Sequence, residues 1–256
     1  MATNLTCEIM KEIKTVKSLL SQDNVKAKFQ EILKERAAGF TANLAVMVGN
    51  NSVLKRLDPT SVVSAAVIAA SMDLPLDPNI GFAAIIPYGD KAQFQIMTKG
   101  LVQLAMRTGQ YKTINVTEIY EGEVLAENRL TGEYTFDFTA KTSDKIVGYA
   151  AYFSLLNGFE KTVYWPIDKI DKHGKRFSKT YKQGVGLWKE DFDAMAKKTV
   201  LKHLLSKWGI LSIEMQRAIK FDQSVVKDVD TEDVDYVDMA EEKSFADDEP
   251  IEGVRG

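Results

Sequence analysis

The stretch IVGYAAYFSLLNGFEKTVYW, residues Ile146–Trp165, decides the fold. Two runs rich in aromatic and β-branched residues flank Asn157-Gly158, a dipeptide typical of the tight turn between antiparallel strands. We therefore expect a β-hairpin whose strands cover Ile146–Leu156 and Phe159–Trp165.

Hydrophobic periodicity predicts further elements on both sides of this hairpin. A second hairpin is expected around Tyr88-Gly89-Asp90, and Asp58 and Pro59 are suited to be the cap and first residue of a helix. The strands of the second hairpin are Gly81–Pro87 and Lys91–Met97, and further strands are expected at Tyr111–Tyr120 and Tyr134–Phe138. Helices are expected at Leu5–Leu20, from Asp23 towards Gly39, at Thr41–Val48, Thr98–Thr108, Leu187–Lys207 and Ser212–Ile219, with a short helix from Pro166 and a polar loop at Asp171–Gly186.

The order of these elements is helices, hairpin, helix, antiparallel strands, helix, which predicts an α+β fold rather than a parallel sheet. We expect an antiparallel sheet with a β-hairpin, packed on a long helix. Residues 1–57 are predicted to be an N-terminal helical region, 58–221 the core and 222–256 an acidic tail. Low hydrophobicity and high negative charge predict that this tail is disordered.

Charge is divided unevenly along the chain. The net charge is -3, yet residues 222–256 contain 13 acidic and 3 basic residues, a balance of -10. Residues 1–221 hold the other 30 basic and 23 acidic residues, a balance of +7. A cationic body attracts phosphate and releases condensed counterions, but an ordinary domain with a solubilising tail has the same division. Charge alone leaves both interpretations open.

Cysteine use and hydropathy indicate the compartment. The single cysteine, Cys7, leaves no internal disulfide framework and is typical of a reducing environment. The N-terminal residues lack the pattern of a signal peptide, and no apolar run reaches the roughly 18 residues of a membrane span. We expect a cytoplasmic protein without membrane contact.

The segment Lys169–Lys202 combines ten basic with four acidic residues, a balance of +6, and aromatic residues are interleaved with them. Such a segment can neutralise phosphates while aromatic faces support unpaired bases. A solvated loop followed by a helix with lysines on its exposed face is the alternative. The candidate DNA-binding residues here are Lys172, Lys175, Arg176, Lys179, Lys182, Lys189, Lys197, Lys198 and Lys202.

A second candidate surface begins at the strand before the helix Thr98–Thr108. Its amides, Gln93 and Gln95, alternate with apolar residues and so share one face of the strand. A polar row then continues at four-residue steps along the helix. This row could line a groove, or it could be a simple exposed stripe. Its members are Lys99, Gln103 and Arg107, and Lys112 would extend it.

Enzymatic functions are poorly supported by the sequence. Two histidines and one cysteine argue against a zinc site, and the glycines are not spaced for a phosphate-binding loop. Asp73, Asp77 and Asp90 could bind Mg²⁺ in a nuclease, but they lie beside Pro and Gly, where Asp commonly stabilises turns. We predict no catalytic residue, no metal site and no cofactor, with Mg²⁺ retained only as a modulator of DNA binding.

Three blocks resemble, in the same order, successive blocks of the phage RecT single-strand annealing proteins. The resemblance covers about Pro75 to Ile219, whereas the N-terminal helices and the acidic tail match only in character. It implies a fold with a β-hairpin, a sheet and a long backing helix. The blocks are LPLDPNIGFAAIIPYG (Leu74–Gly89), QFQIMTKGLVQLAMRTGQ (Gln93–Gln110) and DFDAMAKKTVLKHLLSKWGILSIEMQRAI (Asp191–Ile219).

The resemblance also implies a function. Proteins of this family bind single-stranded DNA, pair it with a complementary strand without ATP, and form rings or helical filaments. By analogy, Gln93–Arg107 and Lys172–Lys202 are expected to converge as two walls of one groove. The expected partners are single-stranded and annealed duplex DNA, copies of the chain itself, and a phage exonuclease or host single-stranded-DNA-binding protein through the tail. A Mg²⁺-dependent DNA-processing enzyme and a DNA-indifferent scaffold are the alternatives.

Overall fold

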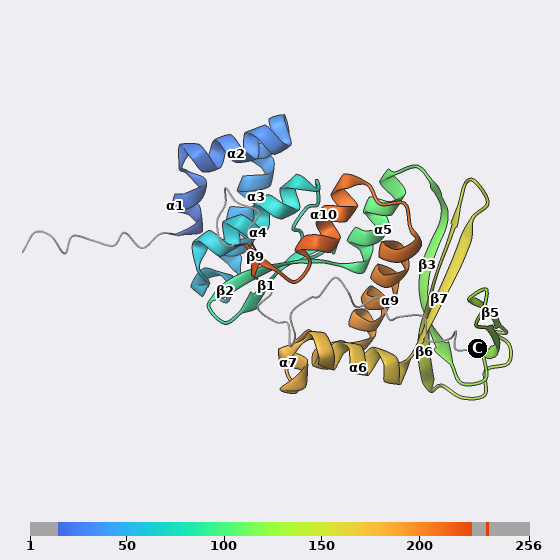
Figure 1. Ribbon diagram of the computed structural model, residues 1–256. Coiled ribbons are helices and arrows are strands. Elements are labelled where there is room, and N and C mark those ends of the chain that lie inside the picture. The colour runs from blue at the N-terminus through green and yellow to red at the C-terminus, as the bar shows by residue number, and fades with distance from the viewer. Residues whose placement is uncertain (1–14, 227–233, 236–256) are drawn as a thin grey trace, which may run out of the picture.

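The computed structural model describes residues 15–226 and 234–235, which form an elongated α+β molecule (Figure 1). The N-terminal helices lie at one end and the largest sheet at the other. The fold class and the N-terminal helical region are thus confirmed, whereas the predicted helical residues before Thr15 lie outside the described residues. The N-terminal elements are α1 (Val16–Leu20), α2 (Asp23–Leu33), η1 (Lys34–Arg36), α3 (Ala37–Asn50), η2 (Leu54–Arg56) and α4 (Pro59–Ser71).

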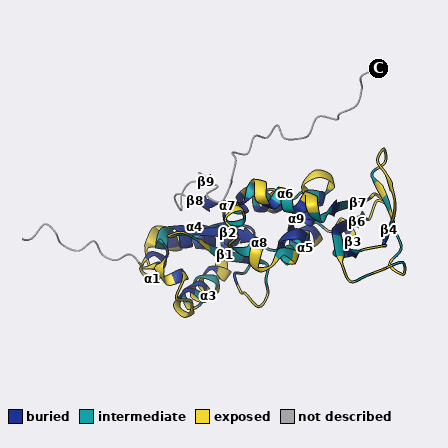
Figure 2. Ribbon diagram, turned by 90° about the horizontal axis from the view of Figure 1, so that it is seen from below, coloured by how far each residue is buried: buried dark blue, intermediate teal, exposed yellow. Residues whose placement is uncertain are grey.

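Helix α4 is the centre of the N-terminal half. It begins as predicted, because the Asp58 carboxylate accepts hydrogen bonds from the backbone N–H groups of Thr60 and Ser61 at 3.2 and 3.0 Å. Its alanines and serines let neighbouring elements approach closely, and α1, α2 and the strand β2 (Lys91–Ile96) pack against it. Figure 2 shows it buried along most of its length.

The predicted hairpin around Tyr88-Gly89-Asp90 is confirmed. Strand β1 (Ala83–Tyr88) pairs antiparallel with β2, and the pairing runs from Ala83 opposite Ile96 to Tyr88 opposite Lys91. Gly89 takes a positive φ of +59° in the turn, where glycine carries no steric penalty. Helix α5 (Thr98–Arg107) follows directly.

The main sheet has the order β3 (Tyr111–Tyr120), β6 (Ile146–Leu155), β7 (Glu160–Pro166), and both pairs are antiparallel. In the predicted turn the Asn157 side chain accepts a hydrogen bond from the N–H of Phe159 at 2.9 Å. The long helix α9 (Phe192–Trp208) packs against all three strands. The predicted antiparallel sheet on a long backing helix is therefore present.

The predicted polar loop at Asp171–Gly186 is wrong. Most of it is helical, in α6 (Ile167–Phe177) and α7 (Lys179–Lys182). The Tyr181 hydroxyl donates to the Asp171 carboxylate at 2.7 Å and joins the two helices. Gly174 faces the rings of Tyr181 and Trp188 so closely that an added Cβ would lie about 3 Å from both. Tertiary packing therefore orders a segment whose polar composition resembles a loop.

Two smaller differences concern the neighbouring elements. The long helix is interrupted at Asp191, which separates α8 (Leu187–Glu190) from α9 and caps α9 by accepting from the N–H of Ala194 at 3.0 Å. The strand predicted at Tyr134–Phe138 is β5 (Glu133–Phe136), and it pairs with β4 (Val124–Asn128), which was not predicted.

The predicted acidic tail begins with ordered residues. After α10 (Ile213–Phe221), Ser224 forms an antiparallel bridge with Phe94 of β2, and the N–H of Gln223 donates to the Phe94 carbonyl at 3.0 Å. Strand β8 (Val225–Val226) then pairs with β9 (Val234–Asp235). The prediction that the chain is disordered from residue 222 onward is therefore wrong for residues 222–226. The rest of the predicted tail, except 234–235, lies outside the described residues. Within the described part of the chain, no helix combines the length and apolarity needed to cross a membrane.

Candidate nucleic-acid interface

Two lysines of α9 share one buried carboxylate. Lys198 and Lys202 are one helical turn apart, and their Nζ atoms lie 2.8 and 2.7 Å from the two carboxylate oxygens of Asp222. The N–H of Ile96 also donates to Asp222, at 3.2 Å. Asp222 and Lys198 are 2% and 4% exposed. This cluster joins the end of α10, the middle of α9 and strand β2 in the interior.

Burial and the mutual charges shift the pKa values in this cluster. Burial opposes ionisation of Asp222, but the two ammonium groups outweigh it and hold the pKa of the carboxyl below its usual value. Burial, followed by repulsion from Lys202, lowers the pKa of Lys198 to about 8 although Asp222 opposes the shift. Removing Asp222 would leave Lys198 in the interior without a counter-ion, whereas removing Lys198 would leave the carboxylate with Lys202 alone. Lys198 is thus held by the fold rather than presented at the surface.

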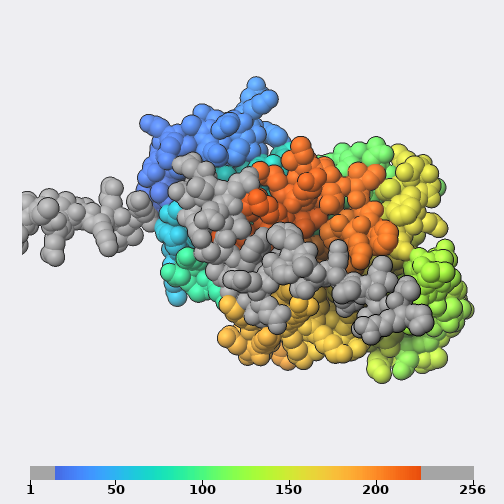
Figure 3. All heavy atoms as spheres, viewed as in Figure 1, coloured from blue at the N-terminus to red at the C-terminus, as the bar shows by residue number. Residues whose placement is uncertain are grey.

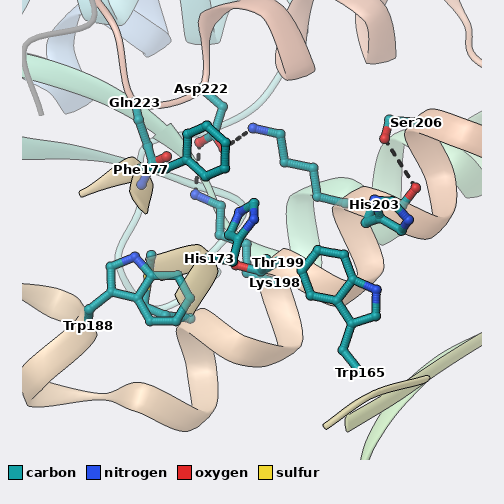
Figure 4. A pocket seen from close by; sticks show the side chains of 12 residues that line it. Trp165, His173, Phe177, Trp188, Lys198, Thr199, His203, Ser206, Asp222 and Gln223 are labelled. Atoms are coloured by element: carbon teal, nitrogen blue, oxygen red, sulfur yellow. Dashed lines mark hydrogen bonds and ion pairs between the residues drawn. The ribbon is translucent and has the colours of Figure 1, made fainter. Parts of the chain in front are cut away.

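A cavity of about 200 Å³ opens beside this cluster (Figure 4). It lies between α6, the end of β7 and α9. Burial lowers the pKa of His173 in its wall to about 4, and the charge of Lys202 adds to the effect. That imidazole is neutral at pH 7. The cavity is lined by Trp165, His173, Phe177, Trp188, Met195, Lys198, Thr199, Lys202, His203, Ser206, Asp222 and Gln223.

The exposed basic residues gather on the preceding helices. The segment Ile167–Lys189 contains seven basic and two acidic residues, a balance of +5, and all seven basic side chains are exposed. In Figure 3 the residues of α6 and α7, in gold, form the lower edge of the molecule. We call this surface the α6–α8 basic face. Its basic residues are Lys169, Lys172, Lys175, Arg176, Lys179, Lys182 and Lys189.

Two predicted residues of the α6–α8 basic face have carboxylate neighbours. Lys172 lies 3.7 Å from Asp168, and Lys175 lies 2.7 Å from Asp171. Both pairs are spaced by four residues on α6, and such exposed pairs are weak. Phosphate oxygens can therefore compete for these ammonium groups. Lys197, outside this face, is half-buried and forms an ion pair with Glu118 of β3.

The amide pair of the second candidate surface does not lie at the surface. Gln93 and Gln95 are 4% and 3% exposed, and the Gln95 amide contacts the Met195 sulfur of α9 at 3.7 Å. The expectation of an exposed amide face on β2 is therefore wrong. The period-two pattern gave the two faces correctly, but α4 and α9 cover them both. The Gln93 Nε2 atom has no hydrogen-bond partner among the described residues.

The polar row of α5 meets a different part of the molecule. The Arg107 guanidinium donates to the backbone carbonyls of Met72 and Asp73 at 2.8 Å each and so satisfies carbonyls at the end of α4. Lys99 is exposed beside Gly81 in the loop before β1, and Gln103 is half-buried. Lys112 is exposed on β3.

The two candidate blocks therefore meet in the interior and not across an exposed groove. Strand β2 contacts α9 through Gln95 and through Asp222, but α5 and α6 lie on different sides of α9 in both Figure 1 and Figure 2. The predicted convergence of Gln93–Arg107 and Lys172–Lys202 as two groove walls is not what this arrangement shows. Whether any individual residue contacts DNA stays a prediction.

The sequence analysis did not identify three residues of this site: Asp222, Trp165 and His173. The sequence does contain a signal for Asp222. Lys198 lies three residues after Met195 and seven before Leu205, in the apolar stripe of α9, and a lysine in such a stripe needs a buried carboxylate. Trp188 is buried, whereas Trp208 is 42% exposed.

The aspartates considered for Mg²⁺ take part in local structure. The Asp77 carboxylate accepts from the backbone and side-chain nitrogens of Asn79 at 2.8 and 3.0 Å, which is turn chemistry as expected. Asp73 has a positive φ and pairs with Arg36. Among residues 15–226 and 234–235, no group of three or more His, Cys, Asp or Glu side chains is placed to hold a metal ion.

Comparison with known proteins identifies the family to which the chain belongs. The model of the RecT family matches residues 38–237. The protein YqaK of Bacillus subtilis (strain 168) is 50% identical over 236 residues, which cover 92% of this chain and 80% of YqaK. Protein RecT of Escherichia coli (strain K12) is 25% identical over 233 residues, 84% of this chain and 83% of that protein. The chain belongs to the RecT family, a family of DNA recombination and annealing proteins.

Proposed function

We propose that this protein binds single-stranded DNA and anneals it to a complementary strand without ATP, as a ring or helical oligomer. The observation that carries the proposal is the α6–α8 basic face, with a balance of +5 and seven exposed cations on one continuous segment. Family membership supports the same conclusion. The setting proposed is phage-type homologous recombination in the bacterial cytoplasm.

The mechanism follows from what lysine and arginine recognise. These side chains contact phosphates, which carry no sequence information, so strands of any sequence are held equally. Base pairing then supplies both the specificity and the driving force of annealing. Each phosphate neutralised releases counterions, so log K falls against log[salt] with a slope of about -0.7 per phosphate for single strands.

The first prediction tests the α6–α8 basic face by charge reversal. Two labelled complementary oligonucleotides are mixed without ATP, and annealing by wild type is compared with Lys179→Glu/Lys182→Glu. We expect the variant to bind single strands about tenfold or more weakly at low salt and to anneal slowly, because two attractive charges become repulsive.

The matched control is Arg129→Glu/Lys207→Glu, which makes the same charge change at exposed positions outside both the α6–α8 basic face and the N-terminal region. It should leave affinity and salt slope near wild type. Equal losses in both variants would show that only overall charge matters, and no loss in either would refute the α6–α8 basic face as the contact. Strand cleavage would favour a DNA-processing enzyme, and oligomers indifferent to DNA would favour a scaffold.

Protomer contacts are proposed at the N-terminal region, and the structure refines the test. Deleting residues 1–20 would remove Val16, Leu19 and Leu20 from the core. The second prediction therefore uses exposed Val46, on α3, whose side chain is 61% exposed. Val46→Asp should reduce oligomer size in sedimentation without changing the monomer's unfolding. An unchanged size distribution would refute this contact.

A further inference from the structure

The cavity between α6 and α9 has the size of an aromatic ring. Its volume is about 200 Å³, and an apolar cavity of roughly 150 Å³ is large enough to bind benzene. The lining differs from that of a dry cavity, because it includes two lysines, one aspartate and hydroxyl groups. It can therefore solvate the polar edge of a ring as well as contact its faces.

One side of the cavity is a continuous series of aromatic rings. The Trp165 ring centroid lies 4.8 Å from that of His203 and 5.3 Å from that of His173, which lies 4.6 Å from Phe177. Trp188 lies on the far side of His173 (Figure 4). Flat π faces of this kind favour the face or edge of another ring.

The charged groups make the cavity a site for an anion. The two lysines and one carboxylate in the lining sum to +1, and neutral His173 does not add to it. Lys202 is half-buried at the cavity, and the exposed Lys169 places its Nζ 4.7 Å from the Trp165 ring centroid. An aromatic ring that carries a negative group matches both the walls and the charge.

We propose that this cavity is a nucleotide pocket, which takes one unpaired base against Trp165, His173 and Phe177 and holds its phosphate with Lys202 and Lys169. The identification of the occupant as a base of the bound DNA strand rests on the proposed function. The aromatic walls contact ring faces, which every base has, so the pocket accepts different bases. One base per protomer is then withheld from pairing until it leaves the pocket.

The test uses thymidine 5′-monophosphate as the probe and tryptophan fluorescence as the readout. Trp165 and Trp188 line the cavity and the third tryptophan, Trp208, does not, so measurements are made in a Trp208→Phe background. We expect saturable quenching by the nucleotide, with affinity at least about tenfold above that of thymidine or inorganic phosphate alone.

An occlusion variant locates the binding. Ser206 is exposed at the rim of the cavity, where a larger side chain fits without disturbing the core. Ser206→Phe should abolish the nucleotide-dependent quenching, whereas Ser206→Ala, which removes the same hydroxyl without adding a ring, should retain it. Thr199→Leu is a second occluding variant and should act like Ser206→Phe.

The outcomes separate this proposal from the proposed function. Wild type that anneals DNA but shows no saturable quenching overturns the pocket and leaves annealing intact. Quenching that survives Ser206→Phe and Thr199→Leu also overturns it. A neutral tyrosine derivative that competes as well as the nucleotide would instead identify a site for a protein side chain. Nucleotide binding without oligonucleotide binding would support the pocket and contradict the annealing function.

Discussion

Two sets of lysines lie within one stretch of sequence but have different environments. Lys198 of α9 is 4% exposed and bound to Asp222, whereas Lys179, Lys182 and Lys189 on α7 and α8 are exposed. Each of these lysines contributes the same single positive charge to the sequence. In the structure, burial beside a counter-ion makes Lys198 part of the fold, whereas the exposed lysines of α7 and α8 remain available to a polyanion.

The largest expected effect tests the buried set. Lys198→Ala should lower the free energy of unfolding by roughly 2–3 kcal/mol, because the buried Asp222 carboxylate loses one of its two charged hydrogen-bond partners and keeps only Lys202. Urea denaturation measures it, with Lys189→Ala as the exposed lysine control that should leave the midpoint nearly unchanged. If the two variants unfolded at the same urea concentration, the comparison between the two sets would be wrong.

The next effect concerns His173, which faces Lys202, His203, Arg176 and Lys169. The imidazole takes up a proton near pH 6.5 in the unfolded chain but only near pH 4 in the folded protein. Between these values the unfolded state binds more protons, so acidification from pH 7 to pH 5 should destabilise the fold by about 2 kcal/mol through this group. His173→Phe should lose that part of the pH dependence of unfolding. An identical pH dependence in both proteins would contradict the burial of this imidazole.

The smallest expected effect concerns Lys172, one of the exposed lysines of the α6–α8 basic face. Lys172 and Asp168 are both largely exposed and 3.7 Å apart, so Lys172→Ala should change the free energy of unfolding by less than about 0.5 kcal/mol. The same substitution should reduce the salt slope of single-strand binding by about 0.7, the contribution of one phosphate contact. A variant that loses stability but keeps its salt slope would place Lys172 with the buried set.

Local signals in the sequence predicted most of the fold. Asp58-Pro59 located the start of α4, Asn157-Gly158 located the hairpin of β6 and β7, and alternation located β3. Each of these depends on residues adjacent in sequence. The helices α6 and α7 depend instead on Gly174 packing against Tyr181 and Trp188, and composition does not reveal such contacts.

The candidate site was predicted less completely for the same reason. The exposed lysines of the α6–α8 basic face were found from their density in the sequence. The burial of Gln93 and Gln95 was not found, because a strand with one polar face gives no sign that a helix covers that face. Asp222 lies 24 residues beyond Lys198, and its role depends on how α10 returns the chain to α9.

The bridge between Ser224 and Phe94 determines where the chain can be shortened safely. A deletion that starts at Asp222 would remove the segment that pairs with Phe94 of β2, together with the carboxylate that Lys198 and Lys202 share. A loss of DNA binding in that variant would then reflect a destabilised core rather than the absence of the acidic tail. A truncation after Val226 instead keeps Asp222 and the bridge to β2, and it removes β9, which pairs with β8.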